Sequence, residues 1–217
     1  MRRRRPDPRV VRLVASWCLS YPDEELLGRV GVLRDTISEQ PPGPPVAALA
    51  RFLDHLDGTD PAVLRSAYVD LFDLSRKHAL HLSYWTDGDT RRRGEVLAAF
   101  KQAYRDSGFV VSLRGELPDH LPVVLEFAAV DPDAGERLLV AYRPSVELVR
   151  LALAERGTPY ADVLTAVCAT LPGASPRDRA GAMALAGGPP AVETVGLEPY
   201  DPRLLPLAEA GAPGHGR

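Results

Sequence analysis

The stretch E-L-P-D-H-L-P-V-V-L-E-F-A-A-V, residues 116–130, decides the fold of this chain. From Val123 onward it is apolar on every side, and only Glu126 interrupts it. A helix that is apolar all round has no stripe to turn toward water, so it belongs in the interior of a helical protein. We therefore expect a single-domain bundle built around this helix.

The entrance to this helix is polar. Pro118 disfavours the helical conformation in the residue before it, and Asp119 can then cap a helix that begins at His120. Pro122 falls in the first turn, where a missing N–H costs little. This pattern places a small polar cluster where the central helix meets the surface.

The flanking sequence is also helical. Apolar residues recur with a period near 3.6 in most of the chain between residues 9 and 171. Residues 73–87 alternate in a way that one strand would show, but a lone strand has no partner, so we expect irregular or helical structure there. The predicted helices cover residues 9–19, 23–37, 46–56, 61–72, 90–106, 133–156 (with a break at Pro144) and 160–171.

Composition limits the class of protein. The chain has 217 residues, 45% of them hydrophobic, which predicts one globular domain. Its net charge of -3 is small and does not indicate a nucleic-acid partner. Residues 1–8 are a basic tail without the apolar run of an export signal, and no 18-residue apolar run exists, so we expect a cytoplasmic protein without stable membrane insertion. Residues 172–217 hold eight glycines and eight prolines, which predicts a largely flexible tail with one short helix near 177–186.

Catalytic motifs are absent from the sequence. It contains no G-x-x-x-x-G-K-[ST], no H-E-x-x-H and no G-x-S-x-G. The two cysteines are far apart in apolar helical patterns and are expected to be buried free thiols. A metal-dependent enzyme using His78 and His81 with Asp73 is an alternative, although two histidines alone make a poor metal site.

Several residues have two interpretations. Asp119 and His120 are either an ordinary helix start or the polar rim of a ligand groove. Glu126 is either a general base or the partner of a surface arginine. Tyr84 and Trp85 are either core residues or the aromatic wall of a peptide groove.

Two long motifs resemble one family. The run Y-V-D-L-F-D-L-S-R-K-H-A-L-H-L-S-Y-W-T-D-G-D-T-R-R-R-G (68–94) and the run E-L-P-D-H-L-P-V-V-L-E-F-A-A (116–129) are similar to the nitrate reductase molybdenum-cofactor assembly chaperones, the delta-subunit or NarJ family. L-S-Y-P-D-E-E-L (19–26) and R-G-T-P-Y-A-D-V-L-T-A-V (156–167) resemble it too. The resemblance covers roughly residues 10–171.

The resemblance implies an all-α, TorD/NarJ-like fold and a dedicated chaperone without catalysis or cofactor of its own. Its partner would be the N-terminal segment of the nitrate reductase catalytic subunit, held while molybdenum-cofactor delivery proteins act and before membrane docking. In the wider chaperone group the P-D-H portion lines the peptide groove, which carries over here onto Pro118, Asp119 and His120 and makes Tyr84 and Trp85 candidates for the groove wall. The predicted peptide-binding set also includes Leu121 and Glu126. A client of another type, a dimethyl sulfoxide or trimethylamine oxide reductase, stays open.

The physical pattern agrees with such a role. A partner segment that becomes an amphipathic helix on binding needs an apolar groove with a few polar anchors. Protonation of His120 near neutral pH would then alter the rim and make binding pH-sensitive.

Overall fold

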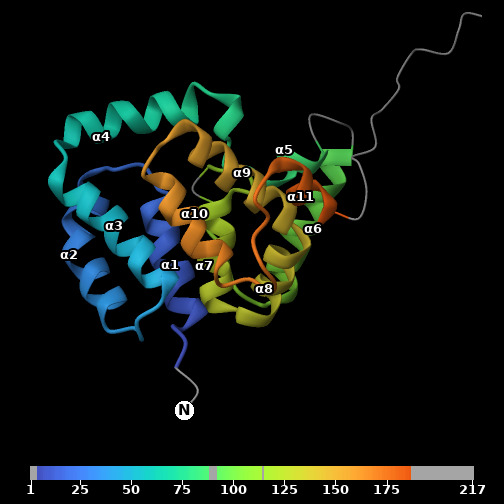
Figure 1. The fold of residues 1–217 in the computed structure, drawn as a ribbon. Coiled ribbons are helices and arrows are strands. Elements are labelled where there is room, and N and C mark those ends of the chain that lie inside the picture. Colours follow the sequence, from blue (N-terminus) through green and yellow to red (C-terminus); the bar gives the residue numbers. More distant parts are fainter. Residues whose placement is uncertain (1–3, 88–91, 114, 187–217) are drawn as a thin grey trace, which may run out of the picture.

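Helices are the main element of the protein in the residues that a computed structural model describes, namely 4–87, 92–113 and 115–186 (Figure 1). The first half contains α1 (Pro8–Cys18), α2 (Glu24–Ser38), α3 (Pro44–Gly58), α4 (Pro61–Tyr68), the π-helix η1 (Val69–Asp73), the 3₁₀ turn η2 (Arg76–His78) and α5 (Leu82–Asp87). The second half contains α6 (Arg92–Asp106), α7 (Leu121–Val130), α8 (Pro132–Ala141), α9 (Arg143–Arg156), α10 (Tyr160–Cys168) and α11 (Arg179–Ala184). The predicted all-α class is confirmed.

Local chemistry explains where the helices begin and end. Asp23 caps α2 by accepting a hydrogen bond from the Leu26 N–H at 2.9 Å. Asp60 caps α4 in the same way, with a proline at the first helical position. Gly157 ends α9 with φ of 70°, a left-handed conformation that costs glycine little.

The predicted break at Pro144 is confirmed. Helix α8 ends at Ala141 and α9 begins at Arg143, so the proline falls in the first turn of a new helix. The first two residues of the helix predicted over 90–106 lie outside the described residues.

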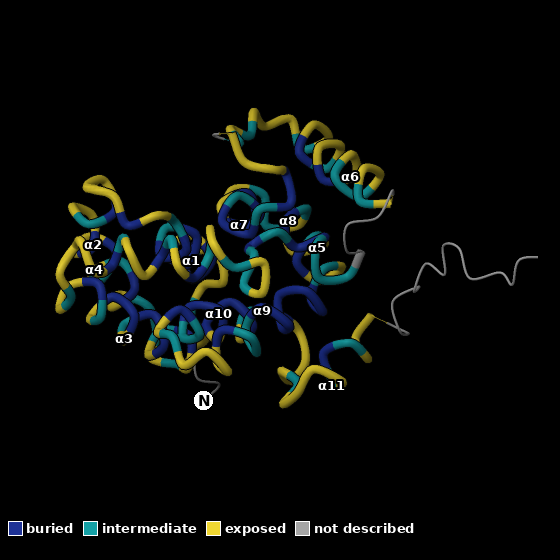
Figure 2. Tube along the Cα trace, turned by 90° about the horizontal axis from the view of Figure 1, so that it is seen from above, coloured by how far each residue is buried: buried dark blue, intermediate teal, exposed yellow. Residues whose placement is uncertain are grey.

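Helix α7 is the apolar centre, as predicted. It packs against α1 and α8, and Leu121, Val124, Leu125 and Ala128 have no exposed surface. Figure 2 shows that buried residues gather along α1, α7, α9 and α10 and that exposed residues lie on the outer helices. Burying one such leucine contributes about 1.5–3 kcal/mol to folding. None of the helices in the described ranges combines the length and apolar character that a bilayer crossing requires.

The crossing of α7 and α8 depends on one glycine. A Cβ atom added at Gly135 would lie 2.2 Å from the Cα of Ala128, well inside van der Waals contact. The two helices can therefore approach this closely only because residue 135 has no side chain.

The predicted cap at the start of α7 is wrong. The N-cap position is His120, which makes no side-chain capping bond, and α7 begins at Leu121. Asp119 is fully buried, and its carboxylate accepts hydrogen bonds from Ser83 instead. The cause is tertiary: His81 and His120 form an isolated antiparallel bridge that turns Asp119 inward.

Residues 172–186 lie against α9. Arg143 donates to the carbonyl oxygens of Gly173 and Ala174 at 3.1 and 2.9 Å, and Arg150 donates to that of Pro176 at 2.6 Å. Both guanidinium groups flank Glu147, which is fully buried. Residues 1–3 and 187–217 of the predicted tails lie outside the described residues.

Candidate functional site

The two long motifs meet at one junction. The Leu82 N–H donates to the carbonyl of Asp119 at 3.1 Å, and the Leu121 N–H donates to the carbonyl of Leu80 at 2.8 Å. The rings of His81 and His120 lie 5.2 Å apart across this pair of bonds. The backbone of residues 80–82 therefore fixes the position from which α7 begins.

Asp119 holds the junction from beneath. Its Oδ2 accepts from the Ser83 N–H at 3.0 Å and from the Ser83 hydroxyl at 2.6 Å. Its Oδ1 lies 3.5 Å from Nδ1 of His81. Burial opposes ionisation, but the proximity of His81 and the hydrogen bonds from Ser83 outweigh it and lower the pKa of Asp119. Asp119 is thus a buried carboxylate with positioning partners, and no part of it faces solvent.

His120 is half-buried above this carboxylate. Burial, followed by the nearby charge of His81, lowers the pKa of His120 to about 4. The imidazole is therefore neutral at pH 7. The expectation that it would take up a proton near neutral pH is wrong, because the ring is too poorly solvated there.

A concave site opens beside His120. It encloses about 370 Å³, and its lining includes Val123 and Glu126 from the outer side of α7. Facing them are Trp17 at the end of α1 and Tyr21 in the following loop. We call this site the acidic groove and define it by its lining residues: Ser16, Trp17, Ser20, Tyr21, Asp23, Glu25, Leu26, Tyr68, Asp73, Ser112, Leu113, Glu116, His120, Pro122, Val123 and Glu126.

The acidic groove has a fixed aromatic wall. Tyr68 donates to the carbonyl of Leu19 at 3.0 Å, and the ring of Tyr21 stands edge-on to Tyr68 at 5.5 Å. Tyr68 directly precedes the π-helix η1, a type of turn that is frequent at functional sites. Asp73 at the end of η1 reaches the same groove.

The charge of the acidic groove is one-sided. Five of its lining residues carry a carboxylate: Asp23, Glu25, Asp73, Glu116 and Glu126. The described residues that line it include no lysine or arginine. The groove therefore favours a cationic ligand.

An apolar hollow continues the groove along α7. It encloses about 190 Å³ and shares Ser112, Val123 and Glu126 with the acidic groove. The segment 109–112 forms its other wall, where Phe109 is 50% exposed and Val110 is fully exposed. Together the two hollows offer an apolar path along one helix, bordered by carboxylates.

The predicted binding residues are divided among three environments. His120 and Glu126 line the acidic groove. Pro118, Asp119 and Leu121 are buried beneath it.

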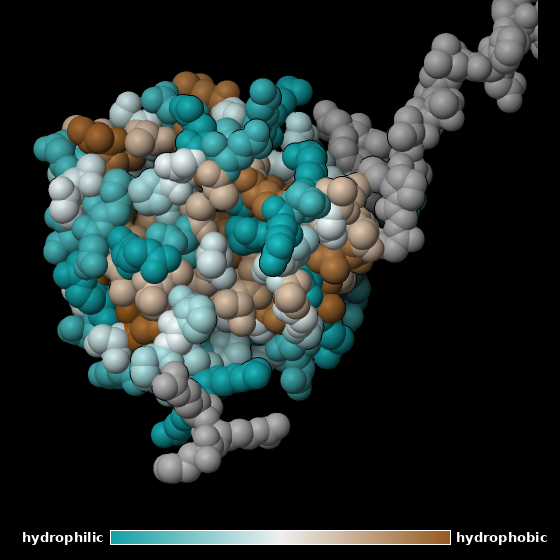
Figure 3. Space-filling model, viewed as in Figure 1, coloured by the Kyte–Doolittle hydropathy of each residue, from teal (hydrophilic) through white to brown (hydrophobic). Residues whose placement is uncertain are grey.

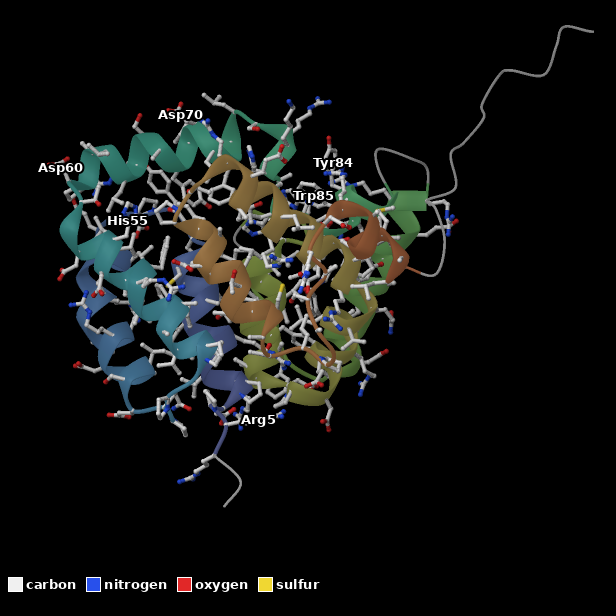
Figure 4. The ribbon with its side chains drawn as sticks, viewed as in Figure 1. Arg5, His55, Asp60, Asp70, Tyr84 and Trp85 are labelled. Carbon is white, nitrogen blue, oxygen red and sulfur yellow. The ribbon has the colours of Figure 1, made fainter. Side chains whose placement is uncertain are left out.

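Tyr84 and Trp85 lie elsewhere, in a separate hollow of about 750 Å³. Figure 4 shows these two side chains next to each other near α5 and α11. The seven predicted residues therefore do not line one continuous groove in the structure.

Three aromatic residues of the groove were not singled out from the sequence: Trp17, Tyr21 and Tyr68. Trp17 falls within the helix predicted over residues 9–19. A signal existed, because Tyr21 and Tyr68 both fall in the motifs that carry the family resemblance. What the motifs do not give is that these segments, 47 residues apart, face α7 together.

His78 and His81 do not share partners. Nδ1 of His78 lies 3.0 Å from the Ser75 hydroxyl, whereas His81 faces Asp119 and lies 4.0 Å from Glu116. In the described part of the chain, no group of three or more His, Cys, Asp or Glu residues could hold a metal ion. Cys18 and Cys168 are buried free thiols, as expected.

Comparison with known proteins defines the class. Residues 40–166 match the family described as the nitrate reductase delta subunit, and the chain belongs to this family. A solved structure from Archaeoglobus fulgidus, described as a redox enzyme maturation protein, shares the fold with a TM-score of 0.58 at 24% identity, over 74% of this chain and 91% of that one.

Two relatives are more specific. The Bacillus subtilis protein described as the nitrate reductase molybdenum cofactor assembly chaperone NarJ is 31% identical over 166 residues, 76% of this chain and 90% of NarJ. NarX of Mycobacterium tuberculosis, described as a nitrate reductase-like protein, is 46% identical over 162 residues, 74% of this chain. That match spans about a quarter of NarX, 24% of its length. The resemblance seen in the motifs is confirmed.

Proposed function

We propose that this chain is a chaperone that binds the N-terminal segment of the nitrate reductase catalytic subunit and assists molybdenum cofactor insertion before membrane docking. The acidic groove carries the proposal, because it offers an apolar path beside α7 with polar anchors at Glu126 and His120. Membership of the delta-subunit family supports the choice of client.

The groove fits a helical segment better than a small molecule. An amphipathic helix places apolar side chains at positions i, i+3 and i+7, and the outer side of α7 presents Val123, Glu126 and Val130 with the same spacing. The client's apolar face would pack on Val123 and Val130 of this row. Trp17 and Tyr21 would supply the large contacts that dominate binding energy.

The carboxylates add selectivity. A client segment with lysine or arginine beside its apolar face would pair with Glu126 and Glu116, and an acidic segment would be repelled. The chain acts in this proposal by holding the immature enzyme, and the cofactor is brought by other proteins.

Fluorescence can test this directly, because the chain has two tryptophans and only Trp17 lines the acidic groove. In the Trp85→Phe variant, titration with the catalytic subunit's N-terminal peptide should shift the Trp17 emission. A peptide from another molybdenum oxidoreductase should bind at least tenfold more weakly. Equal or tighter binding of that peptide would assign a different client.

The matched variants are Glu126→Lys and Glu155→Lys, both exposed helix positions on different hollows. Glu126→Lys should weaken the nitrate reductase peptide about tenfold, equal to about 1.4 kcal/mol, whereas Glu155→Lys should leave it within twofold. Absence of heat and of any emission change at high micromolar peptide would end the proposal.

A further inference from the structure

A second concave surface has the opposite charge. We call it the basic hollow and define it by its lining residues: Arg76, Lys77, His78, Tyr84, Trp85, Ala152, Glu155, Arg156 and Arg179. Four of these are arginine or lysine and one is glutamate, in a chain whose net charge is -3. The lining of this hollow is therefore positively charged, although the net charge of the whole chain is negative.

Three of these cations lack an ion-pair partner in the part of the chain that the structure describes. Within the described residues, no carboxylate lies within ion-pair distance of Arg76, Lys77 or Arg156. Other arginines are paired, for example Arg51 with Asp162 and Arg12 with Glu136. The positive charges also act on their neighbour, because burial and then Arg156 and Lys77 lower the pKa of His78.

Two aromatic rings form one wall of the basic hollow. The Trp85 indole N–H donates to the carbonyl of Ala79 at 2.8 Å, which fixes the ring. Tyr84 stands edge-on to it at 6.3 Å, and the Arg179 guanidinium lies 5.8 Å from the centre of the indole. A fixed aromatic ring beside unpaired cations suits a ligand with both apolar and anionic groups.

The cations come from separate parts of the fold. Arg76 and Lys77 lie on η2, Arg156 ends α9, and Arg179 begins α11. Figure 3 shows hydrophilic side chains mixed with small apolar patches over α9 and α11. Separate charges around a hollow of about 750 Å³, twice the volume of the acidic groove, match carboxylates spaced along a peptide better than one compact anion.

We propose that the basic hollow binds an acidic peptide segment of a partner protein, with an apolar or aromatic side chain packed on Trp85. This surface is distinct from the acidic groove, so the two could be occupied together by segments of opposite charge. The proposal does not depend on the identity of the client in the groove.

The Trp17→Phe variant of the full chain leaves Trp85 as the reporter. The probe is an eight-residue peptide, Asp-Glu-Leu-Asp-Glu-Phe-Asp-Glu, and its control replaces every acid with lysine. The acidic probe should shift the Trp85 emission and bind at least tenfold more tightly than the lysine peptide. Absence of an emission change with the acidic probe at millimolar concentration overturns the proposal.

Charge reversals locate the binding. Arg156→Glu should weaken the probe at least tenfold, whereas Arg137→Glu, an exposed position that lines none of the hollows described above, should change binding less than twofold. Equal losses in both variants would mean that only net charge matters, which contradicts a defined site.

Two further experiments, the second and third arms of the test, compare the acidic peptide with two other possible ligands of the basic hollow: ATP and the chain's own acidic residues. If ATP binds more tightly than the peptide and with the same dependence on Arg156, the hollow is a site for a small anion and the proposal fails. The third arm replaces Glu193, Glu198 and Asp201 by their amides in the full chain. An altered Trp85 emission without added peptide would assign the hollow to the chain's own acidic residues.

Discussion

The carboxylate of Asp119 accepts two hydrogen bonds from Ser83, at 3.0 Å from the backbone N–H and 2.6 Å from the hydroxyl, across 36 residues of sequence. Both residues are fully buried. Ser83 belongs to α5, which also carries Tyr84 and Trp85 of the basic hollow, and Asp119 precedes α7, which carries one side of the acidic groove. This pair therefore ties the two surfaces to each other.

Removing this carboxylate should destabilise the fold. Asp119→Ala removes the acceptor of two buried donors, the Ser83 N–H and the Ser83 O–H, and we expect a loss of about 3 kcal/mol in the free energy of unfolding. Ser83→Ala keeps the backbone bond and should cost about 1 kcal/mol. Urea denaturation measures both, and a loss below 1 kcal/mol in Asp119→Ala would show that the pair holds little.

The difference in free energy of unfolding between the parent and an Asp119 variant should become smaller at acidic pH. The pKa of Asp119 is lowered by folding, so its stabilisation is fully present above the unfolded-state pKa of about 3.9 and is lost as pH falls through the lower folded-state value. The gap between the parent and Asp119→Asn should therefore shrink below about pH 4. A gap that stays constant from pH 7 to the most acidic pH at which the parent is folded would contradict an ionised Asp119.

His120 should make the protein less stable in mild acid. Its pKa is about 4 in the folded chain and near 6.5 when solvated, so between these values the unfolded chain binds a proton that the folded chain does not. The free energy of unfolding should consequently fall as pH decreases from 6.5 to 4, and change little through His120 above 6.5.

His120→Gln tests this assignment. The titratable groups that act on His120 are His81 and Asp119, and both remain in the variant. Urea denaturation at pH 7 and pH 5 should show a smaller loss in His120→Gln than in the parent. Equal losses would place the acid sensitivity in other groups.

Much of the fold is predictable because its determinants are local. Asp23 and Asp60 cap helices through side-chain bonds to nearby N–H groups, and Pro144 marks a new helix start. The fully apolar character of residues 123–130 similarly predicts a central α7. Such features depend on a few neighbouring residues, so a sequence pattern identifies them.

The site depends on pairing between distant segments, and this is where prediction from sequence fails. Asp119 follows a proline and precedes a helix, a pattern that is typical of a cap, yet its partner is Ser83. Tyr84 and Trp85 share a motif with Tyr68 but end up on a different surface. The carboxylates of the acidic groove come from segments between residues 23 and 126, and only the tertiary fold gathers them.

The close crossing of α7 and α8 gives a stability test. Gly135→Ala would push a methyl group to within 2.2 Å of Ala128 Cα, and backbone atoms cannot yield as a flexible side chain does. We expect a loss of about 3 kcal/mol or more in the free energy of unfolding.

The control is Gly28→Ala. Gly28 lies exposed in the middle of α2 with nothing within 4 Å of the added Cβ, so this change should instead stabilise the protein by about 0.5–1 kcal/mol. Thermal unfolding of both variants measures the contrast, and similar melting temperatures would contradict the close packing.

Glu147 offers a test of how residues 172–176 are held on α9. It is fully buried between Arg150, at 2.7 Å, and Arg143, at 3.6 Å, and these two arginines bind the carbonyls of that segment. Glu147→Gln leaves two guanidinium groups without their carboxylate and should cost about 3–5 kcal/mol. The same change at exposed Glu155 of the same helix should stay within about 0.5 kcal/mol. Limited proteolysis should cut residues 172–176 faster in Glu147→Gln, and an unchanged cleavage rate would show that the arginines hold the segment without Glu147.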